Sequence, residues 1–203
     1  MNGLAMKRES TTDHTAAGFA PTGCNIEPIA ARPNAYRLDI TGFLAPGWTG
    51  RLAAGLAQHR VGIVRGEAEK VTASNWRSNF ELKTAPFAKD PLSIDYLRLA
   101  GTELPYDRDA GKIALLDFVM EPSSRHQGSL YIQVKGVDRL GFLGDLLDYF
   151  SMRCLFPVKM TVETVADTAV DRFWLRGVAG SIPSESITAS IKENLEMLLI
   201  RTR

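Results

Sequence analysis

The stretch LYIQVKGVDRLGFLGDLLDYF, residues 130–150, changes its apolar pattern part of the way along. Its first residues alternate, with Leu130, Ile132 and Val134 apolar and more polar residues between them, which is the period of a half-buried β-strand. After Gly141 the apolar residues recur every three to four positions, as on the buried face of an α-helix. The stretch therefore predicts a strand, a glycine-containing turn and a helix in direct succession.

A second stretch, YRLDITGFLAPGWTGRLAAGL at residues 36–56, repeats this pattern. Its strand-like part and its helix-like part keep the apolar phase of the stretch 130–150. The glycines also coincide when the two stretches are superposed: Gly42 falls on Gly136, Gly47 on Gly141 and Gly50 on Gly144. A repeat of this kind predicts two copies of one structural unit.

Each copy continues with further strands and a second helix. In the first copy we expect strands at 61–71 and 78–83, a helix at 90–101 and a last strand at 112–120. In the second copy we expect strands at 157–165 and 171–177 and a helix at 184–198. The order β-α-β-β-α-β predicts an α+β fold of two ferredoxin-like domains in tandem, each an antiparallel sheet with its helices on one face.

We expect the two domains to span residues 35–124 and 125–203. Residues 1–34 are rich in Thr, Ala, Gly and Pro without periodicity, so we expect a mostly disordered tail there. In the second domain, either MLLIRTR at 197–203 is the last strand or the sheet lacks one. Sheets that lie side by side suggest either pairing within one chain or a homodimer, and we favour the homodimer.

The composition argues against several classes of protein. Among 203 residues, 24 Lys and Arg balance 23 Asp and Glu, so no basic excess favours direct binding to nucleic acid. The three His and two Cys have the spacing of neither a metal site nor a disulfide framework, and we expect no cofactor. No catalytic triad pattern is identifiable, so we expect no enzyme. No apolar run has the length of a signal peptide or a membrane span, so we expect a cytoplasmic protein without a membrane partner.

The glycine turn between the strand and the helix of the second copy has several readings. A phosphate-binding loop fails on spacing, because GxGxxG requires glycine where Asp138 stands. Acyl phosphate hydrolysis fails because Arg139 is misplaced and the matching strands contain no Asn. Two readings stay open, namely a purely structural turn and a site for a small ligand.

The turn VDRLGFL, residues 137–143, resembles the strand-to-helix turn of the ACT domain family. In that family an acidic or amide residue and a basic or apolar one precede a glycine. Two such domains without a catalytic domain resemble stand-alone tandem-ACT regulators of the glycine cleavage repressor type. The resemblance covers most of residues 36–203 and implies that the protein binds a small amino acid where two ACT domains meet.

The chemistry of the turn fits an amino acid. Backbone N–H groups at the start of a helix attract a carboxylate, and Gly141 permits close approach because it has no side chain. Asp138 is suited to hold an α-ammonium group, and Arg139 to pair with a carboxylate. The first copy has Leu44 and Ala45 at these two positions, so we expect the polar half of the site in the second copy. The expected ligand-binding residues are Asp138, Arg139, Leu140, Gly141, Phe142 and Gly47.

The sequence thus favours a non-catalytic regulatory protein that binds a small amino acid and signals to a partner protein, which the sequence does not name. The alternative is a protein-interaction or dimerisation module that uses ACT-like sheets without a ligand. The charged pair Asp138 and Arg139 favours a sensor, whereas FLAP at 43–46 favours a purely structural role.

Overall fold

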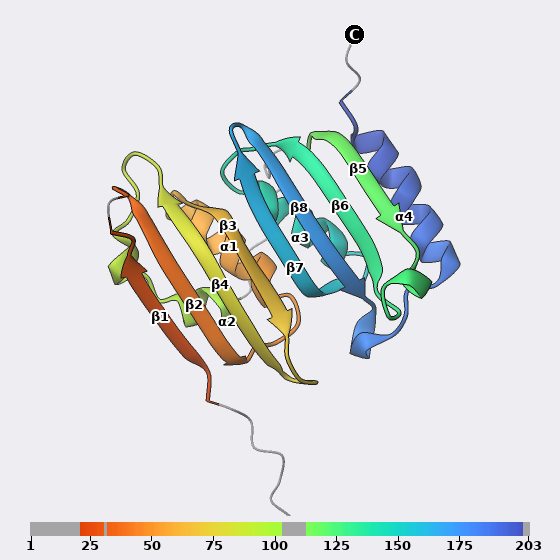
Figure 1. Ribbon diagram of the computed structural model, residues 1–203, viewed down its shortest axis with the longest axis horizontal. Helices are drawn as coiled ribbons and strands as arrows, with labels where there is room; N and C mark the ends of the chain where they lie inside the picture. The colour runs from red at the N-terminus through yellow and green to blue at the C-terminus, as the bar shows by residue number, and fades with distance from the viewer. Residues whose placement is uncertain (1–20, 31, 103–112, 201–203) are drawn as a thin grey trace, which may run out of the picture.

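A computed structural model describes residues 21–30, 32–102 and 113–200 of the chain. Over these residues the fold is α+β, with one eight-stranded antiparallel sheet and four α-helices (Figure 1). No helix in these residues is long and apolar enough to cross a membrane.

The strands, in chain order, are β1 (Gly23–Pro28), β2 (Ala35–Phe43), β3 (Val61–Lys70), β4 (Asn75–Thr84), β5 (Leu115–Glu121), β6 (Leu130–Val137), β7 (Phe156–Val165) and β8 (Thr168–Arg176). The α-helices are α1 (Trp48–Gln58), α2 (Tyr96–Gly101), α3 (Phe142–Ser151) and α4 (Glu185–Leu198). The described part of the chain also contains the short 3-10 helices η1 (Pro91–Ser93), η2 (Ser123–Arg125) and η3 (Val178–Gly180).

The strand order β1-β2-β4-β3-β7-β8-β6-β5 divides the sheet into two halves with the same internal arrangement. Both halves contain a β-α-β-β unit, formed by β2, α1, β3 and β4 in the first and by β6, α3, β7 and β8 in the second. The repeated stretches 36–56 and 130–150 therefore occupy equivalent places, as the sequence predicts. The turns between strand and helix also match, because Gly47 and Gly141 are both left-handed N-cap residues, with φ of 79° and 88°.

The edge strands differ from the expectation. The segment expected to close the first sheet, 112–120, contains β5, which pairs with β6 in the second half. The equivalent edge of the first half is β1, which pairs with β2 over Gly23–Pro28 and so replaces part of the tail expected at 1–34. β5 therefore pairs with β6 across the expected boundary near residue 124, which stays a prediction. Residues 1–20 lie outside the described residues.

Two other segments also depart from the sequence interpretation. The helix expected at 90–101 is split into η1 and α2 because Ile94 is extended and Asp95 caps a new start, its side chain accepting from the Arg98 N–H. The C-terminal segment MLLIRTR is not a full strand. Its first two residues end α4, Leu199 forms a single parallel bridge to Leu115, and residues 201–203 lie outside the described residues.

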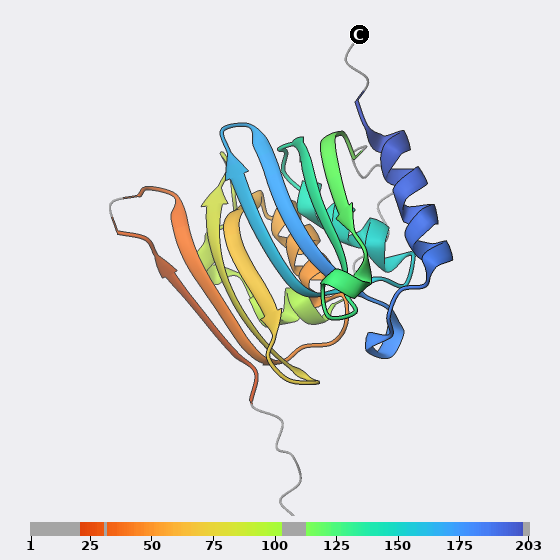
Figure 2. The same cartoon turned by 45° about the vertical axis from the view of Figure 1, so that its right-hand side comes forward.

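The two halves are joined within one chain. β3 pairs with β7 from Arg65 to Glu69, which makes the sheet continuous across the middle. α1, α2 and α3 lie on one face of this sheet, and α4 stands beside the edge strand β5 (Figures 1 and 2). Intrachain pairing is thus one of the two arrangements expected from the sequence, and the homodimer stays a prediction.

The helices α1 and α3 cross at two glycines. A Cβ added to Gly144 would lie 3.1 Å from the backbone nitrogen of Ala54, and one added to Gly50 would lie 3.3 Å from the Cβ of Leu147. Only a residue without a side chain permits this distance between the helices. The crossing lies behind the β3–β7 pair, so both layers of the fold connect the halves, and the buried apolar side chains form one cluster.

We predict that Gly144→Ala destabilises the protein by about 1–3 kcal/mol, because the added methyl group forces the two helix backbones apart. Chemical denaturation, followed by circular dichroism, measures this free energy of unfolding. Gly101→Ala is the matched control, since a Cβ at Gly101 has no neighbour among the described residues within 4 Å. It should leave the free energy of unfolding unchanged or raise it. Equal stability of the two variants would contradict the close packing of α1 on α3.

Candidate functional site

The turn between β6 and α3 leaves the start of the helix open. Gly141 is the N-cap with φ 88° and ψ −8°, and no described side chain accepts a hydrogen bond from the first turn of α3. The N–H of Phe142 is used locally, by the carbonyl of Arg139 at 3.1 Å. The N–H groups that follow in the first turn have no partner within the helix, which leaves a positive end for an anionic group.

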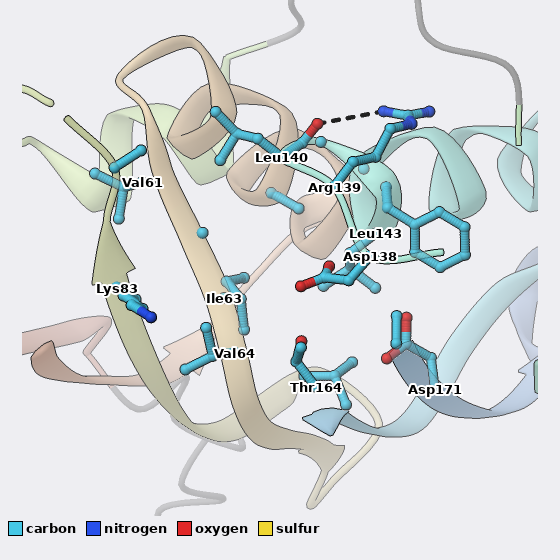
Figure 3. A pocket seen from close by; sticks show the side chains of 18 of the residues that line it. Val61, Ile63, Val64, Lys83, Asp138, Arg139, Leu140, Leu143, Thr164 and Asp171 are labelled. Carbon is cyan, nitrogen blue, oxygen red and sulfur yellow. Dashed lines mark hydrogen bonds between the residues drawn. The ribbon is translucent and has the colours of Figure 1, made fainter. Parts of the chain in front are cut away.

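A cavity of about 330 Å³ lies at this turn, on the junction between the two halves (Figure 3). The first half contributes residues 61–64 of β3 and residues 83–86 at the end of β4. The second half contributes the turn 138–144 and side chains from β7 and β8. Because both halves form its walls, the cavity exists only in the joined molecule.

Five of the six residues expected to bind a ligand line this cavity, namely Asp138, Arg139, Leu140, Gly141 and Phe142. Asp138 is exposed at the opening and points inward (Figure 3). Leu140 lies over Gly62 of β3, and Phe142 is buried in the core. Gly47, the sixth residue, lies apart from them at the equivalent turn of the first half, next to Phe156.

Arg139 is positioned differently from the expectation. Its guanidinium forms an ion pair with Asp145 of α3 and donates to the carbonyl of Leu140 at 3.2 Å. In Figure 3 it points away from Asp138 and from the interior of the cavity. In this arrangement the open start of α3 is better placed than Arg139 to receive a carboxylate.

Asp171 is the residue of the site that the sequence interpretation missed. It lies on β8 with 3% of its surface exposed, and it lines the cavity together with Asp138. Burial raises the pKa of Asp171 from its ordinary value of 3.8 to about 7, and the charge of Asp138 adds to this rise. A backbone hydrogen bond from Glu163 and the charge of Arg172 act in the opposite direction. No described Lys, Arg or His forms an ion pair with it.

The two halves differ at the positions that open or fill this space. In the second half Gly136 of β6 pairs with Ala169 of β8, whereas in the first half Gly42 pairs with Trp76 of β4. Trp76 is 6% exposed and packs edge-on against Trp48, with the ring centroids 5.5 Å apart. A large ring thus occupies in the first half the place where the second half has only a methyl group.

The next inward position differs in polarity. Ser78 in the first half stands where Asp171 stands in the second, since they pair with the equivalent residues Ile40 and Val134. The Ser78 hydroxyl donates to the carbonyl of Ile40 at 3.0 Å, so this buried group is satisfied inside the sheet. An ionised carboxylate has no proton to donate and offers several acceptor sites, of which the backbone N–H of Glu163 uses one.

The turn of the first half is covered by its own helix. Arg51 of α1 donates to the carbonyl of Ala100 at 2.8 Å and to that of Pro46 at 3.1 Å. Its counterpart in α3 is Asp145, which holds Arg139 instead. The first turn is therefore closed by a side chain, whereas the second faces the cavity.

The sequence contained a signal for Asp171. Along β8 the inward positions are Ala169, Asp171, Phe173 and Leu175, so a carboxylate stands in an otherwise apolar alternation. Charged residues are almost never fully buried without a partner, so a carboxylate at an inward position indicates a candidate functional residue. The sequence interpretation missed Asp171 because it placed the start of the strand at that residue. It therefore did not include Ala169, the inward-facing residue that precedes Asp171 in β8.

Comparisons with known proteins add no assignment. No protein-family model matches the chain, and neither a curated protein nor a solved structure matches it. Within the described residues no group of three or more His, Cys, Asp or Glu is arranged to hold a metal ion. The chemistry of the site must therefore be argued from the cavity itself.

We predict that Asp171→Asn stabilises the protein at pH 8 relative to wild type. The folded protein holds a proton on Asp171 that the unfolded chain has lost between about pH 4 and pH 7. The stability from this group is present in full below about pH 4 and is lost as the pH rises to about 7. The difference in unfolding free energy between the variant and wild type should therefore grow by up to about 4 kcal/mol across this window and then level off.

Urea denaturation of both proteins from pH 4.5 to pH 8 measures this difference. Ser78→Ala provides the control, because it removes a buried polar group at the equivalent position without removing an acid. Its effect on stability should be the same at every pH. A constant difference between Asp171→Asn and wild type would mean that Asp171 is not a buried, proton-binding carboxyl group.

Proposed function

We propose that this protein is a non-catalytic regulatory protein that binds a small amino acid in the cavity between its two halves. The proposal rests on three features that lie together at this cavity: the open start of α3, the carboxylate of Asp138 and the wall formed by the first half. A free amino acid offers a carboxylate and an ammonium group on adjacent atoms, which matches a helix N-terminus next to an acidic side chain.

The size and lining of the cavity agree with a small ligand. Its volume of about 330 Å³ is at the lower end of the ~300–1,000 Å³ typical of ligand pockets. Apolar side chains such as Ala53, Ile63 and Val162 line it, together with the polar groups at the turn. A small apolar side chain of the ligand fits against such walls.

The ACT resemblance supports the same function at the level of architecture. In each half an edge strand occupies the outer position beside β2 or β6, which gives the neighbour relations of a ferredoxin-like sheet, although that strand precedes its unit in the chain. In this proposal the halves are ACT-like domains, and the ligand lies at their junction. Because the ligand touches both halves, its binding changes the stability of the whole junction. A partner protein then binds the liganded and unliganded states differently. The cytoplasmic location, the homodimer and the absence of catalysis belong to the same proposal.

We predict that at least one small amino acid raises the melting temperature of the protein. A ligand at 100 times its Kd adds about 2.7 kcal/mol, which corresponds to roughly 5–10 °C for a chain of this size. A thermal melting screen of the twenty amino acids at millimolar concentration, beginning with glycine, measures the shift. Asp138→Ala should abolish the shift and leave the melting temperature without ligand close to wild type, because Asp138 is exposed.

Leu44→Ala is the matched control, since Leu44 has the place of Asp138 in the turn of the first half. It packs against the core, so its truncation should lower the melting temperature without ligand and leave the response to the ligand intact. If no amino acid shifts the melting temperature, the protein is better explained as an interaction module without a ligand.

A further inference from the structure

We infer that each chain holds a single ligand site, in the second half, and that the buried carboxylate of Asp171, together with Asp138, binds the cationic group of the ligand. The inference rests on the proposed function for the class of ligand, a small molecule with an ammonium group. It goes beyond that function because it names the residue that selects the cation and states why the equivalent place in the first half binds nothing.

The first argument is the position of Asp171 at the inner end of the cavity. The carboxylate comes from an inward-facing position of β8 and points into the cavity (Figure 3), which Ala169 of the same strand also lines. It is 3% exposed, so water reaches it only through the cavity. An ammonium group of a ligand that enters the cavity would add a charged donor to the backbone N–H of Glu163, and charge-assisted hydrogen bonds of this type are strong.

The second argument is the balance of charges around Asp171. From the turn, Asp138 adds a second carboxylate at the same cavity, and Arg139 is held by Asp145. From β7, the backbone of Glu163 donates to Asp171, while the Glu163 side chain pairs with Arg65. Two carboxylates therefore face the cavity, and they favour a cation over an anion inside it.

Two basic side chains complete this balance. Lys83, at the end of β4, lines the cavity but is exposed to solvent. Arg172, next to Asp171 in β8, lies on the opposite face of the strand and donates to Gln133 at 3.1 Å. Neither forms an ion pair with Asp171. The inner end of the cavity is thus acidic, while its exposed side carries the positive end of α3 and Lys83.

The third argument is that the first half shows what a purely structural version of this place contains. There Trp76 fills the volume and Ser78 satisfies its own hydroxyl within the sheet. The first half therefore completes the same fold without a cavity and without a buried carboxylate at these positions. An ionisable carboxyl group in the core costs stability, so Ala169 and Asp171 are explained better by a ligand than by packing.

Ligand binding should also release a proton from Asp171, so that the affinity depends on pH. The ammonium group pairs with the ionised form of Asp171, whereas burial favours the protonated form in the empty site. Below about pH 7, binding therefore releases close to one proton per chain, and affinity rises with pH up to that value. A side chain with only a structural role would not produce this release.

Isothermal titration calorimetry of the full chain tests the inference, with glycine, L-alanine, L-serine, ethylamine and N-acetylglycine as probes. Titrations at pH 6 in two buffers that differ in ionisation enthalpy give the number of protons released. We expect one site per chain, with no binding of N-acetylglycine, which lacks the cation. Asp171→Asn should weaken binding by about 10- to 100-fold and abolish the proton release, because a charged hydrogen bond is lost.

Ala169→Trp, which places the residue of the first half in the second, should abolish binding by filling the cavity. Ala169→Leu serves the same purpose if the larger ring prevents folding, and circular dichroism verifies the fold of each variant. Ser78→Ala is the matched control and should leave affinity and stoichiometry unchanged.

The outcomes separate this inference from the proposed function. Binding of an amino acid with two sites per chain, or with wild-type affinity and proton release in Asp171→Asn, overturns the inference and leaves the proposed function standing. Binding of ethylamine alone, dependent on Asp171, supports the inference and overturns amino-acid sensing. If none of the probes binds at millimolar concentration, the inference is overturned.

Discussion

The pairing of β3 with β7 is the constraint on which the rest of the molecule depends. It joins two half-sheets through their inner edges, and the crossing of α1 and α3 at Gly50 and Gly144 repeats the connection in the helical layer. With both layers continuous, the halves share one core and have no free inner edges. The cavity follows from this connection, because the turn after β6 projects over β3 only when the two halves are held together.

The sequence predicted the parts of the fold that are governed by local periodicity. Strand alternation followed by a helical stripe identifies β2 with α1 and β6 with α3, and both left-handed turns fall at the repeated glycines. The edge strands could not be assigned in this way. Nothing in the residues of β5 indicates whether it pairs with a strand before it or after it, because that choice depends on which edge is vacant. The break at Ile94 was missed for a related reason, since Asp95 competes with the continuing helix as a second cap.

The site was predictable as a turn but not as a cavity. Asp138 and Gly141 were recognisable because charge and glycine stand out in a short loop. The importance of Ala169 is visible only beside Trp76, because a small residue creates space only where larger residues surround it. For Arg139 the sequence identified the charge but not the direction of the side chain. That direction is set by the ion pair with Asp145 in the first turn of α3.

The asymmetry between the halves explains how a buried acid is tolerated. In the first half Trp48 packs against both Trp76 and Phe80, and aromatic contacts of this kind stabilise a core beyond the area they bury. The second half carries a cavity and a carboxyl group, both of which reduce stability. Because the two halves share one core and one sheet, the well-packed half holds the other in its folded form. In a single unit with the residues of the second half, no well-packed second unit would offset the free-energy cost of the cavity and the buried carboxyl group. The difference at the inward positions thus leaves one half to stabilise the fold and gives the other the cavity in which we propose that a ligand binds.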